Sequence, residues 1–355
     1  MKALTLNKIF IVTSMPSSIS RKRPTIEDVA RLAGLSIATV SRYINATVVV
    51  SERSAAKIQA AIEELHFIPQ TAAQVLARKK TNTIGLLLTG ISGDFFTPML
   101  RGIETRAKED GYSLLIHSTE IQSELRSPFN KILAEHNTDG LIVFTTSLND
   151  AELKRLSAIG FPVVLLHRST PQNYEIPYVI VENKNGARSM IDHLIDVHHW
   201  QRIVHLQGPA DHEDAYWRGV GYRQSLEAHG ILYDPQLIGS GEFSAAQASI
   251  AVQSLLSRDV KFDAIFAGDD ESASGALMEL RNAGIRVPEE VAVVGFDDLN
   301  LAAHLTPPLT TVHAPIEEAG YEAVDKLVRL MRGEQVELET MLPTQLIIRK
   351  SCGCS

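Results

Sequence analysis

The chain has 355 residues, of which 45% are hydrophobic and 21% charged, so it exceeds one ordinary domain and has a globular composition. No apolar run approaches the ~20 residues of a membrane helix, so no membrane partner is expected. Residues 1–80 carry 12 Lys and Arg against 5 Asp and Glu, which leaves 22 against 37 for the rest. A basic N-terminal part therefore precedes an acidic body, a pattern that suits phosphate binding at one end.

Residues 1–24 contain no recognisable element. Their apolar stretch IFIV is too short for the core of a secretory signal, and Met15 is an alternative start. We expect a disordered arm that ends in a basic lead-in at Arg21, Lys22 and Arg23.

Residues 25–45 read TIEDVARLAGLSIATVSRYIN and predict two short helices joined by a tight turn. Thr25, followed three residues later by Asp28, is a short variant of a capping box for a helix from Ile26. Gly34 ends that helix because glycine takes left-handed angles without steric cost, and Ser36 caps a second helix. This arrangement predicts a helix-turn-helix.

The second helix has two different faces. Val40 and Ile44 are four residues apart and can pack on the first helix. The opposite face carries small and polar residues together with Arg42, and an Arg has the shape that binds guanine O6 and N7 in the major groove. An ordinary helical hairpin with a solvated face is the alternative interpretation.

A third helix is predicted after Ser51, with Ile58, Ile62 and Leu65 at helical spacing, and Pro69 is expected to end it. Residues 25–70 would then form a compact headpiece. The following segment, residues 71–82, is compatible with a helix but is too short to be stable alone, so we expect a hinge or linker.

These segments, in this order and spacing, resemble the LacI/GalR family of bacterial transcription regulators. The resemblance implies that the second helix enters the major groove and that the hinge folds on operator DNA. By position, it implies base contacts from Ile37, Ala38 and Arg42, phosphate contacts from Ser36, Thr39 and Ser41, and a minor-groove wedge from Leu76.

From Thr83 onwards, apolar runs such as TIGLLL, DGLIVF and DAIFA alternate with amphipathic segments, which predicts parallel sheets covered on both faces. The resemblance divides them into an α/β core like that of periplasmic binding proteins, with two Rossmann-like subdomains and crossovers near Glu182, Val312 and Pro343. One subdomain would comprise residues 83–182 with 312–342, including a helix near 316–332. The other would comprise 183–311 with 343–355, including a final strand TQLIIR.

Ligands of open parallel sheets bind beyond the carboxyl ends of the strands. The residues that follow the strands there, partly assigned through the resemblance, give these effector-binding candidates: Asp94, Phe95, Phe96, His212, Asp214, Arg218, Phe243, Asp269 and Asp297. For some of them, structural roles remain open. Phe95 and Phe96 are also compatible with a core, Arg218 and Asp297 with an ion pair between domains, and Asp269 with a purely structural role.

No metal site or cofactor is expected. The consecutive residues His212, Glu213 and Asp214 point in different directions on a regular backbone, which disfavours a metal or acid/base site. His193, His198 and His199 lack the i, i+4 zinc spacing and suggest a solvated helix end. Cys352 and Cys354 are too close for an unstrained disulfide, and a metal there would lack further ligands. His167 and His198 depart from the family pattern, which has an acidic residue and a glycine there.

The sequence therefore predicts a cytoplasmic operator-binding repressor that a small effector controls. No phosphate-binding loop or nucleophile elbow is present, so no enzyme is expected. The local charges favour a neutral sugar, because three cleft Asp residues face one Arg. A purine- or nucleoside-responsive regulator and a stand-alone sugar-binding receptor are the alternatives. No heptad tail follows Arg349, so a homodimer on a pseudo-palindrome is expected rather than a tetramer.

Overall fold

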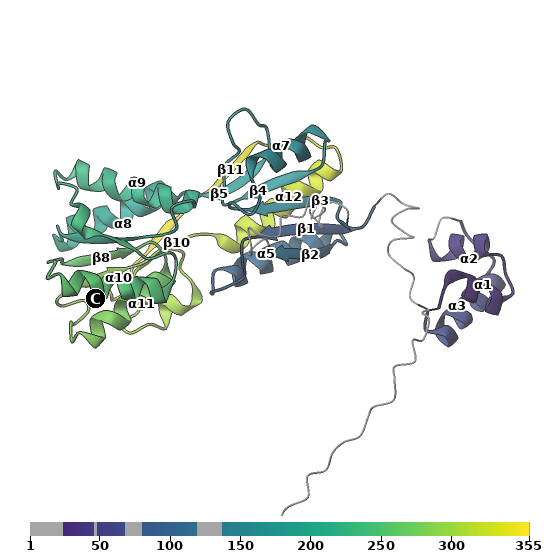
Figure 1. The fold of residues 1–355 in the computed structure, drawn as a ribbon, viewed down its shortest axis with the longest axis horizontal. Coiled ribbons are helices and arrows are strands. Elements are labelled where there is room, and N and C mark those ends of the chain that lie inside the picture. The colour runs from purple at the N-terminus through teal and green to yellow at the C-terminus, as the bar shows by residue number, and fades with distance from the viewer. Residues whose placement is uncertain (1–23, 46–47, 68–79, 119–136, 355) are drawn as a thin grey trace, which may run out of the picture. The chain divides into compact units, whose positions relative to one another are not determined.

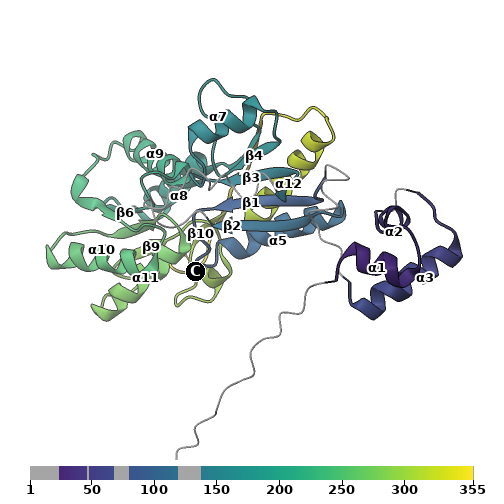
Figure 2. The same ribbon diagram turned by 45° about the vertical axis from the view of Figure 1, so that its right-hand side comes forward.

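The computed structural model describes residues 24–45, 48–67, 80–118 and 137–354. They form two compact units, one within residues 1–81 and the other within residues 82–355 (Figures 1 and 2). We call the first unit the headpiece and the second the core.

The headpiece contains the three predicted helices, α1 (Ile26–Ala33), α2 (Ile37–Ile44) and α3 (Glu52–Leu65). The last helix ends earlier than expected. His66 takes left-handed angles, the amide of Phe67 donates to the Ile62 carbonyl, and the Phe67 ring is buried. This C-terminal cap ends α3 before Pro69, which lies outside the described residues, so the prediction that the proline ends the helix is wrong.

The core contains a six-stranded sheet and a four-stranded sheet, and every pairing within each of them is parallel. The larger sheet has the order β11-β5-β4-β3-β1-β2. Its strands are β1 (Thr83–Leu88), β2 (Ser113–Ser118), β3 (Gly140–Phe144), β4 (Val163–Leu166), β5 (Tyr178–Val181) and β11 (Glu339–Leu342). Among its helices, α5 (Phe96–Glu109) and α12 (Ile316–Met331) cover one face, and α7 (Asp150–Ala158) covers the other.

The smaller sheet has the order β7-β6-β8-β9. Its strands are β6 (Ile203–Gln207), β7 (Ile238–Ser240), β8 (Ala264–Ala267) and β9 (Ala292–Val294). Its helices are α8 (Asn183–His198), α9 (Glu213–Ala228), α10 (Ala245–Ser257) and α11 (Asp270–Asn282), with short 3-10 turns at η1 (Pro235–Leu237) and η2 (Asn300–Ala303).

Strand β8 shows why these runs are continuously apolar. Ala264 and Phe266 pack toward α8 and α9, whereas Ile265 and Ala267 pack toward α10 and α11, which lie on the opposite face of the sheet (Figure 1). Successive side chains of a strand point to opposite faces, and both faces are buried here, so no polar alternation remains.

The last predicted strand does not join the smaller sheet. β12 (Gln345–Ile347) pairs antiparallel with β10 (Thr311–His313) in a separate two-stranded sheet, and the residues that follow it contact the smaller sheet, where the Val293 amide donates to the Ser351 carbonyl. Both strands lie in segments that cross between the two larger sheets. α12 returns to the first sheet as expected, where it packs on α5.

Candidate functional site

The helix-turn-helix is stabilised by local caps. The Thr25 hydroxyl accepts a hydrogen bond from the Asp28 amide at 3.3 Å, and the Asp28 carboxylate accepts one from the Thr25 amide at 2.9 Å, which completes the predicted capping box. Gly34 has φ +66° and ends α1, and the Ser36 hydroxyl accepts from the Thr39 amide at the start of α2. Each turn is therefore fixed by residues close in sequence.

One face of α2 is buried and the other is free. Val40 packs on Val29, Ala30 and Ala33 in a core that also contains Ile58. On the opposite face Ile37, Ala38 and Arg42 are exposed, and Ile37 retains 49% of its accessible surface. Within the described part of the headpiece, this face is therefore free of packing contacts with the core.

The hydroxyl residues beside this face have local partners. Ser36 and Thr39 hydroxyls lie 2.8 Å apart, and the Asn45 amide donates to Ser41 at 3.3 Å. These bonds orient the hydroxyls along the start and the outer edge of α2. Leu76, the proposed minor-groove wedge, lies outside the described residues.

A cavity of about 470 Å³ lies at the carboxyl ends of strands from both sheets of the core. Its first wall comes from the loops after β1 and β3, and its second from the loops after β6, β7, β8 and β9. It is lined by Thr89, Gly90, Ser92, Gly93, Phe95, Phe96, Phe144, Thr145, Pro209, His212, Asp214, Arg218, Glu242, Phe243, Ser244, Asp269, Glu271 and Asp297.

The structure brings together every predicted effector residue except Asp94. Asp94 is exposed and lines a neighbouring groove instead, so its predicted contact with the effector stays a prediction. Its backbone amide donates to the Glu271 carboxylate at 2.6 Å, and this bond fixes the loop so that Phe95, not Asp94, lines the cavity.

Arg218 forms the centre of the cavity floor and is 2% exposed. Its guanidinium donates to Asp297 at 2.7 Å, to the Gly268 carbonyl at 2.6 Å and to Asn183 at 2.8 Å. The Phe296 ring lies 3.8 Å from the guanidinium carbon, in cation–π geometry. Arg218 and Asp297 do form an ion pair, but both come from the side of the smaller sheet, so the pair does not join the two sheets.

A second carboxylate joins the two sides of the cleft. Asp214, at the start of α9, lies 2.7 Å from His167 Nδ1 and accepts from Asn183 at 2.7 Å. His167 directly follows β4 of the larger sheet and is 1% exposed. His167 therefore supplies a buried contact between the two sides of the cleft, in addition to the bond between the Asp94 amide and Glu271.

Burial changes the ionisation of these carboxyl groups. It raises the pKa of Asp269 to about 7, with a further contribution from the Asp297 carboxylate. Burial also raises the pKa of Asp297, against the opposing effect of Arg218. At Asp214 burial acts in the same direction, but His167 and Arg218 outweigh it and leave the pKa below its usual value. Asp269 also caps α11 through the Ser272 amide, so it has a structural role as well.

Aromatic rings cover two sides of the cavity. Phe95, Phe96 and Phe144 form edge-to-face or tilted contacts with centroids 5.6–5.9 Å apart. Opposite them, Phe243 lies over the Arg218 guanidinium at 5.5 Å and has φ +51°, which is uncommon for a bulky residue. A Cβ at Gly208 would lie 2.3 Å from the Phe243 ring, so this glycine leaves the space that the ring occupies.

Asn183 and Glu271 belong to this site but were not among the predicted effector residues. Glu271 is two residues beyond Asp269. It would have been a candidate if more residues after the end of each strand had been considered. Asn183 follows β5, a strand that the sequence analysis did not identify, and begins α8. Both residues were therefore detectable as polar positions just after an apolar run.

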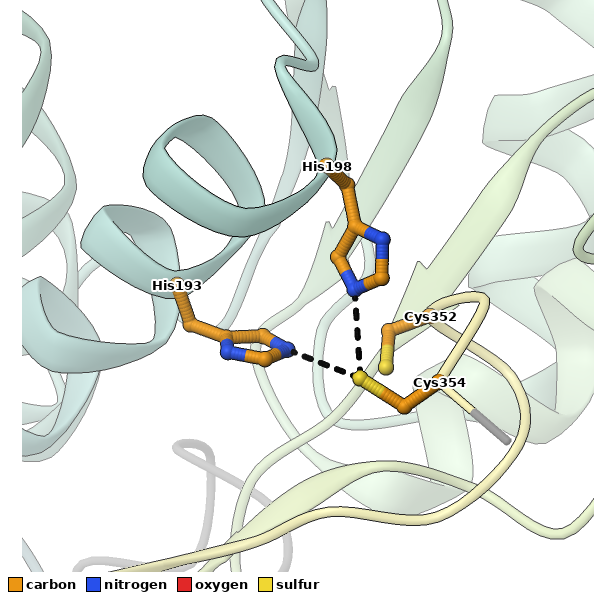
Figure 3. Close-up of side chains that lie close together, drawn as sticks. All are labelled: His193, His198, Cys352 and Cys354. Atoms are coloured by element: carbon orange, nitrogen blue, oxygen red, sulfur yellow. Dashed lines mark hydrogen bonds between the residues drawn. The ribbon is translucent and has the colours of Figure 1, made fainter.

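The expectation of a solvated helix end at His193 and His198 is wrong, and so is the expectation that a metal at Cys352 and Cys354 would lack further ligands. His193 and His198, at the end of α8, are half-buried rather than solvated, and they lie beside Cys352 and Cys354 (Figure 3). Four groups that can bind a metal therefore converge, although their positions in the sequence are about 150 residues apart.

The sequence matches the description "Bacterial regulatory proteins, lacI family" over residues 25–70 and "Periplasmic binding protein-like domain" over residues 191–352. It is 32% identical to the ribose operon repressor of Escherichia coli (strain K12), over 92% of this chain and 98% of that one. It is 34% identical to the transcriptional regulator CelR of Thermobifida fusca, over 93% and 99%. It is 33% identical to the repressor PurR of Aliivibrio fischeri (strain MJ11), over 88% and 93%.

Two solved structures resemble this one. A complex of the regulator CelR with cellobiose has a TM-score of 0.70 and 32% identity, over 93% of this chain and all of that one. A Lac repressor dimer bound to operator and the anti-inducer ONPF has a TM-score of 0.78 and 28% identity, over 93% and 99%. Among the described residues, no helix is long and apolar enough to cross a membrane.

Proposed function

The chain belongs to the lacI family of bacterial regulatory proteins and is a DNA-binding transcription regulator rather than an enzyme, and from that premise we propose that a neutral sugar in the cleft controls it. The regulator would act on DNA in the cytoplasm. We expect repression in the absence of the sugar and release when it binds.

The observation that supports this proposal most strongly is the lining of the cavity, which combines carboxylates, one Arg and aromatic rings. Asp214, Asp297 and Glu271 can accept hydrogen bonds from sugar hydroxyls, and Arg218 can donate to them. Phe95 and Phe243 offer apolar faces to a ring. Among the residues that the structure describes, Arg218 is the only Arg or Lys of the lining, and Asp297 already pairs with it, so a phosphate or carboxylate would meet an excess of negative charge from them.

A purine or nucleoside is the second candidate. The opposed Phe95 and Phe243 side chains would suit a flat aromatic ligand, and a relative of this chain is named PurR. The carboxylates discriminate against this candidate in part, because a nucleobase has fewer hydroxyl donors than a sugar. The two candidates therefore differ in a direct binding assay.

Calorimetry tests the proposal with ribose, cellobiose, hypoxanthine, adenosine and glucose 6-phosphate as ligands. We expect one of the neutral sugars to bind with a Kd on the order of 1–100 μM. A purine that outcompetes every neutral sugar, or tight binding of the sugar phosphate, would contradict the proposal.

The matched variants are Asp297→Asn and Asp298→Asn. Asp297 lines the cavity, whereas its neighbour Asp298 pairs with Arg349 at 2.7 Å and lies outside the cavity lining. We expect Asp297→Asn to abolish sugar binding and induction while it leaves ligand-free operator binding intact, and Asp298→Asn to change neither. Arg218→Lys should act like Asp297→Asn. These conservative changes avoid the instability that truncation to Ala would cause.

For DNA we propose a homodimer that reads a pseudo-palindrome. One headpiece covers little surface, so two copies of α2 would enter adjacent major grooves, with Leu76 from each chain at the centre. Light scattering should give a dimer at micromolar concentration. A stable tetramer, or a monomer with full operator affinity, would overturn this arrangement. Leu76→Ala should lose DNA bending.

We further propose that the hinge couples the two sites. Sugar binding would change the geometry of the cleft and thereby whether residues 71–80, of which 71–79 lie outside the described residues, can fold on DNA. A ligand with ~100-fold differential affinity supplies about 2.7 kcal/mol, enough to melt a marginal segment. Hydrogen exchange of the hinge on operator DNA should change with sugar. No change despite altered DNA affinity would place the switch elsewhere.

A further inference from the structure

Two histidines and two cysteines converge outside the cleft, at the junction of α8 and residues 351–354. Figure 3 shows His193 and His198 projecting from the end of the helix toward the Cys352 and Cys354 side chains. One ligand atom from each residue lies within 4.8 Å of all the others. The cavity lining contains none of these residues, so the cluster belongs to a different site.

We propose that His193, His198, Cys352 and Cys354 bind one zinc ion in a tetrahedral structural site. The set of two thiolates and two imidazoles is the donor combination that selects zinc among the common divalent ions. These four residues would occupy all four coordination positions of the ion, as in structural zinc sites, and would leave none open for a substrate. No cofactor or metal is assigned to this position by the function proposed above.

The distances between the four ligand atoms are close to those of tetrahedral zinc coordination. Zinc bonds of about 2.3 Å to sulfur and about 2.0 Å to nitrogen place neighbouring ligand atoms roughly 3.3–3.8 Å apart. Cys354 Sγ lies 3.3 Å from His198 Nε2 and 3.7 Å from His193 Nε2. The widest separation, 4.8 Å, therefore requires only a small inward movement of side chains.

The backbone explains how residues so close in sequence supply two ligands. Gly353 has φ +104°, a conformation that favours glycine, and its amide donates to the Lys350 carbonyl. This turn places both cysteine sulfurs on the side of α8. A Cβ at Gly353 would lie 3.4 Å from His198 Nδ1, an ordinary van der Waals contact, so the positive φ rather than crowding by the imidazole favours glycine here.

Neighbouring contacts hold the ligands in place. Cys352 is fully buried, and its sulfur accepts from the Thr310 hydroxyl at 3.2 Å. His193 and His198 meet edge to face at 5.1 Å. α8 ends at His198, and the next residue, His199, is exposed and outside the cluster.

A disulfide is a poor alternative for the same cysteines. They are the only two in the chain and are separated by one residue, which strains an intramolecular bridge. Zinc would instead tie residues 351–354, just after β12, to α8. Because β12 belongs to a segment that crosses between the sheets, the ion would anchor that segment to the smaller sheet's side.

The test uses full-length protein loaded with zinc, dialysed against metal-free buffer and analysed by elemental mass spectrometry. We expect one zinc per chain in the wild type, and loss of retained zinc in Cys354→Ser and His198→Gln. His199→Asn is the matched control, because Asn tolerates the left-handed angles of that position, and it should retain zinc like the wild type. Circular dichroism establishes that each variant is folded.

Cobalt(II) substitution supplies a second readout that needs neither sugar nor DNA. Tetrahedral thiolate coordination should give intense visible d–d bands and a sulfur-to-cobalt charge-transfer band, and Cys354→Ser should weaken both. Equal zinc retention in Cys354→Ser and the wild type, or a weak octahedral cobalt spectrum, would overturn the proposal. Neither result would bear on the proposed sugar effector.

Discussion

In the headpiece, the residues predicted to contact the ligand are separate from those that stabilise the fold, whereas in the cleft the same residues do both. In the headpiece, Val40 packs inward while Ile37 and Arg42 point outward from the same helix. In the cleft, Arg218 and Asp297 line the ligand cavity and are also each other's buried partners. Contact residues on an exposed face can therefore change without loss of stability, whereas truncation of a contact residue in the buried network should also destabilise the fold.

The largest expected effect is on the stability of the core. Arg218→Ala would leave Asp297 and Asp214 without their buried cation, which costs about 3–5 kcal/mol of unfolding free energy. Arg223→Ala, on the exposed side of the same helix, should change it by less than about 0.5 kcal/mol. Urea denaturation measures both. Equal losses in the two variants would remove the contrast between buried and exposed positions.

The second effect is a pH dependence of the core's stability that Asp269 of the cleft contributes. Asp269 has a pKa of about 7 in the folded chain and 3.8 as its reference value, so the folded state holds the proton more tightly. Its contribution to stability is therefore lost as pH rises from about 4 to 7, with a limit on the order of 4 kcal/mol.

The buried His205 opposes this trend. Burial lowers its pKa to about 3, so its contribution is lost as pH falls below about 6.5. The informative quantity is thus the difference between wild type and Asp269→Asn, which keeps a capping side chain for α11. The variant should gain stability over the wild type from pH 4 to 7. A constant difference would show that Asp269 does not titrate there.

The third effect should appear in DNA binding and not in stability. Arg42→Ala should weaken specific binding by about 1–3 kcal/mol and relax the preference at one base position per half-site. The free energy of unfolding of the headpiece should stay within about 0.5 kcal/mol of the wild-type value, because Arg42 is exposed. Fluorescence anisotropy measures the affinity of the wild type and of Arg42→Ala for operator DNA and for random DNA. Arg53→Ala, on α3, is the control, and equal losses on both DNAs would exclude base reading by Arg42.

The smallest effect tests the local caps of the headpiece. Thr25→Ala removes the hydroxyl that accepts from the Asp28 amide and should cost about 1 kcal/mol of headpiece stability. Thr25→Ser keeps that acceptor and should recover most of the loss. Thermal unfolding of both variants is the measurement, and an identical loss in the two would show that the capping bond contributes nothing.

The same contrast explains what the sequence could predict. Caps and turns of the headpiece depend on residues within a few positions, so Thr25, Gly34 and Ser36 were predicted correctly. Strand ends indicated part of the cleft, including Phe95, Phe96 and Asp269, because parallel strands bring their carboxyl ends to one edge, and the family resemblance supplied others such as Arg218 and Phe243.

Partners far apart in the chain were beyond local patterns. His167 meets Asp214 across the cleft, and His198 meets Cys354. No spacing rule joins such pairs, because tertiary packing alone brings them together. Asp94 lies outside the cavity lining for a related reason, because the bond between its amide and the distant Glu271 orients its loop.

The most direct test is the operator affinity of wild type and Phe243→Ala, with and without the neutral sugar that calorimetry identifies. The cleft account predicts that sugar changes the wild-type affinity by roughly 5–150-fold and leaves that of Phe243→Ala nearly unchanged, while both proteins bind operator equally without sugar. It would be contradicted if no neutral sugar altered operator binding and a purine or a sugar phosphate did.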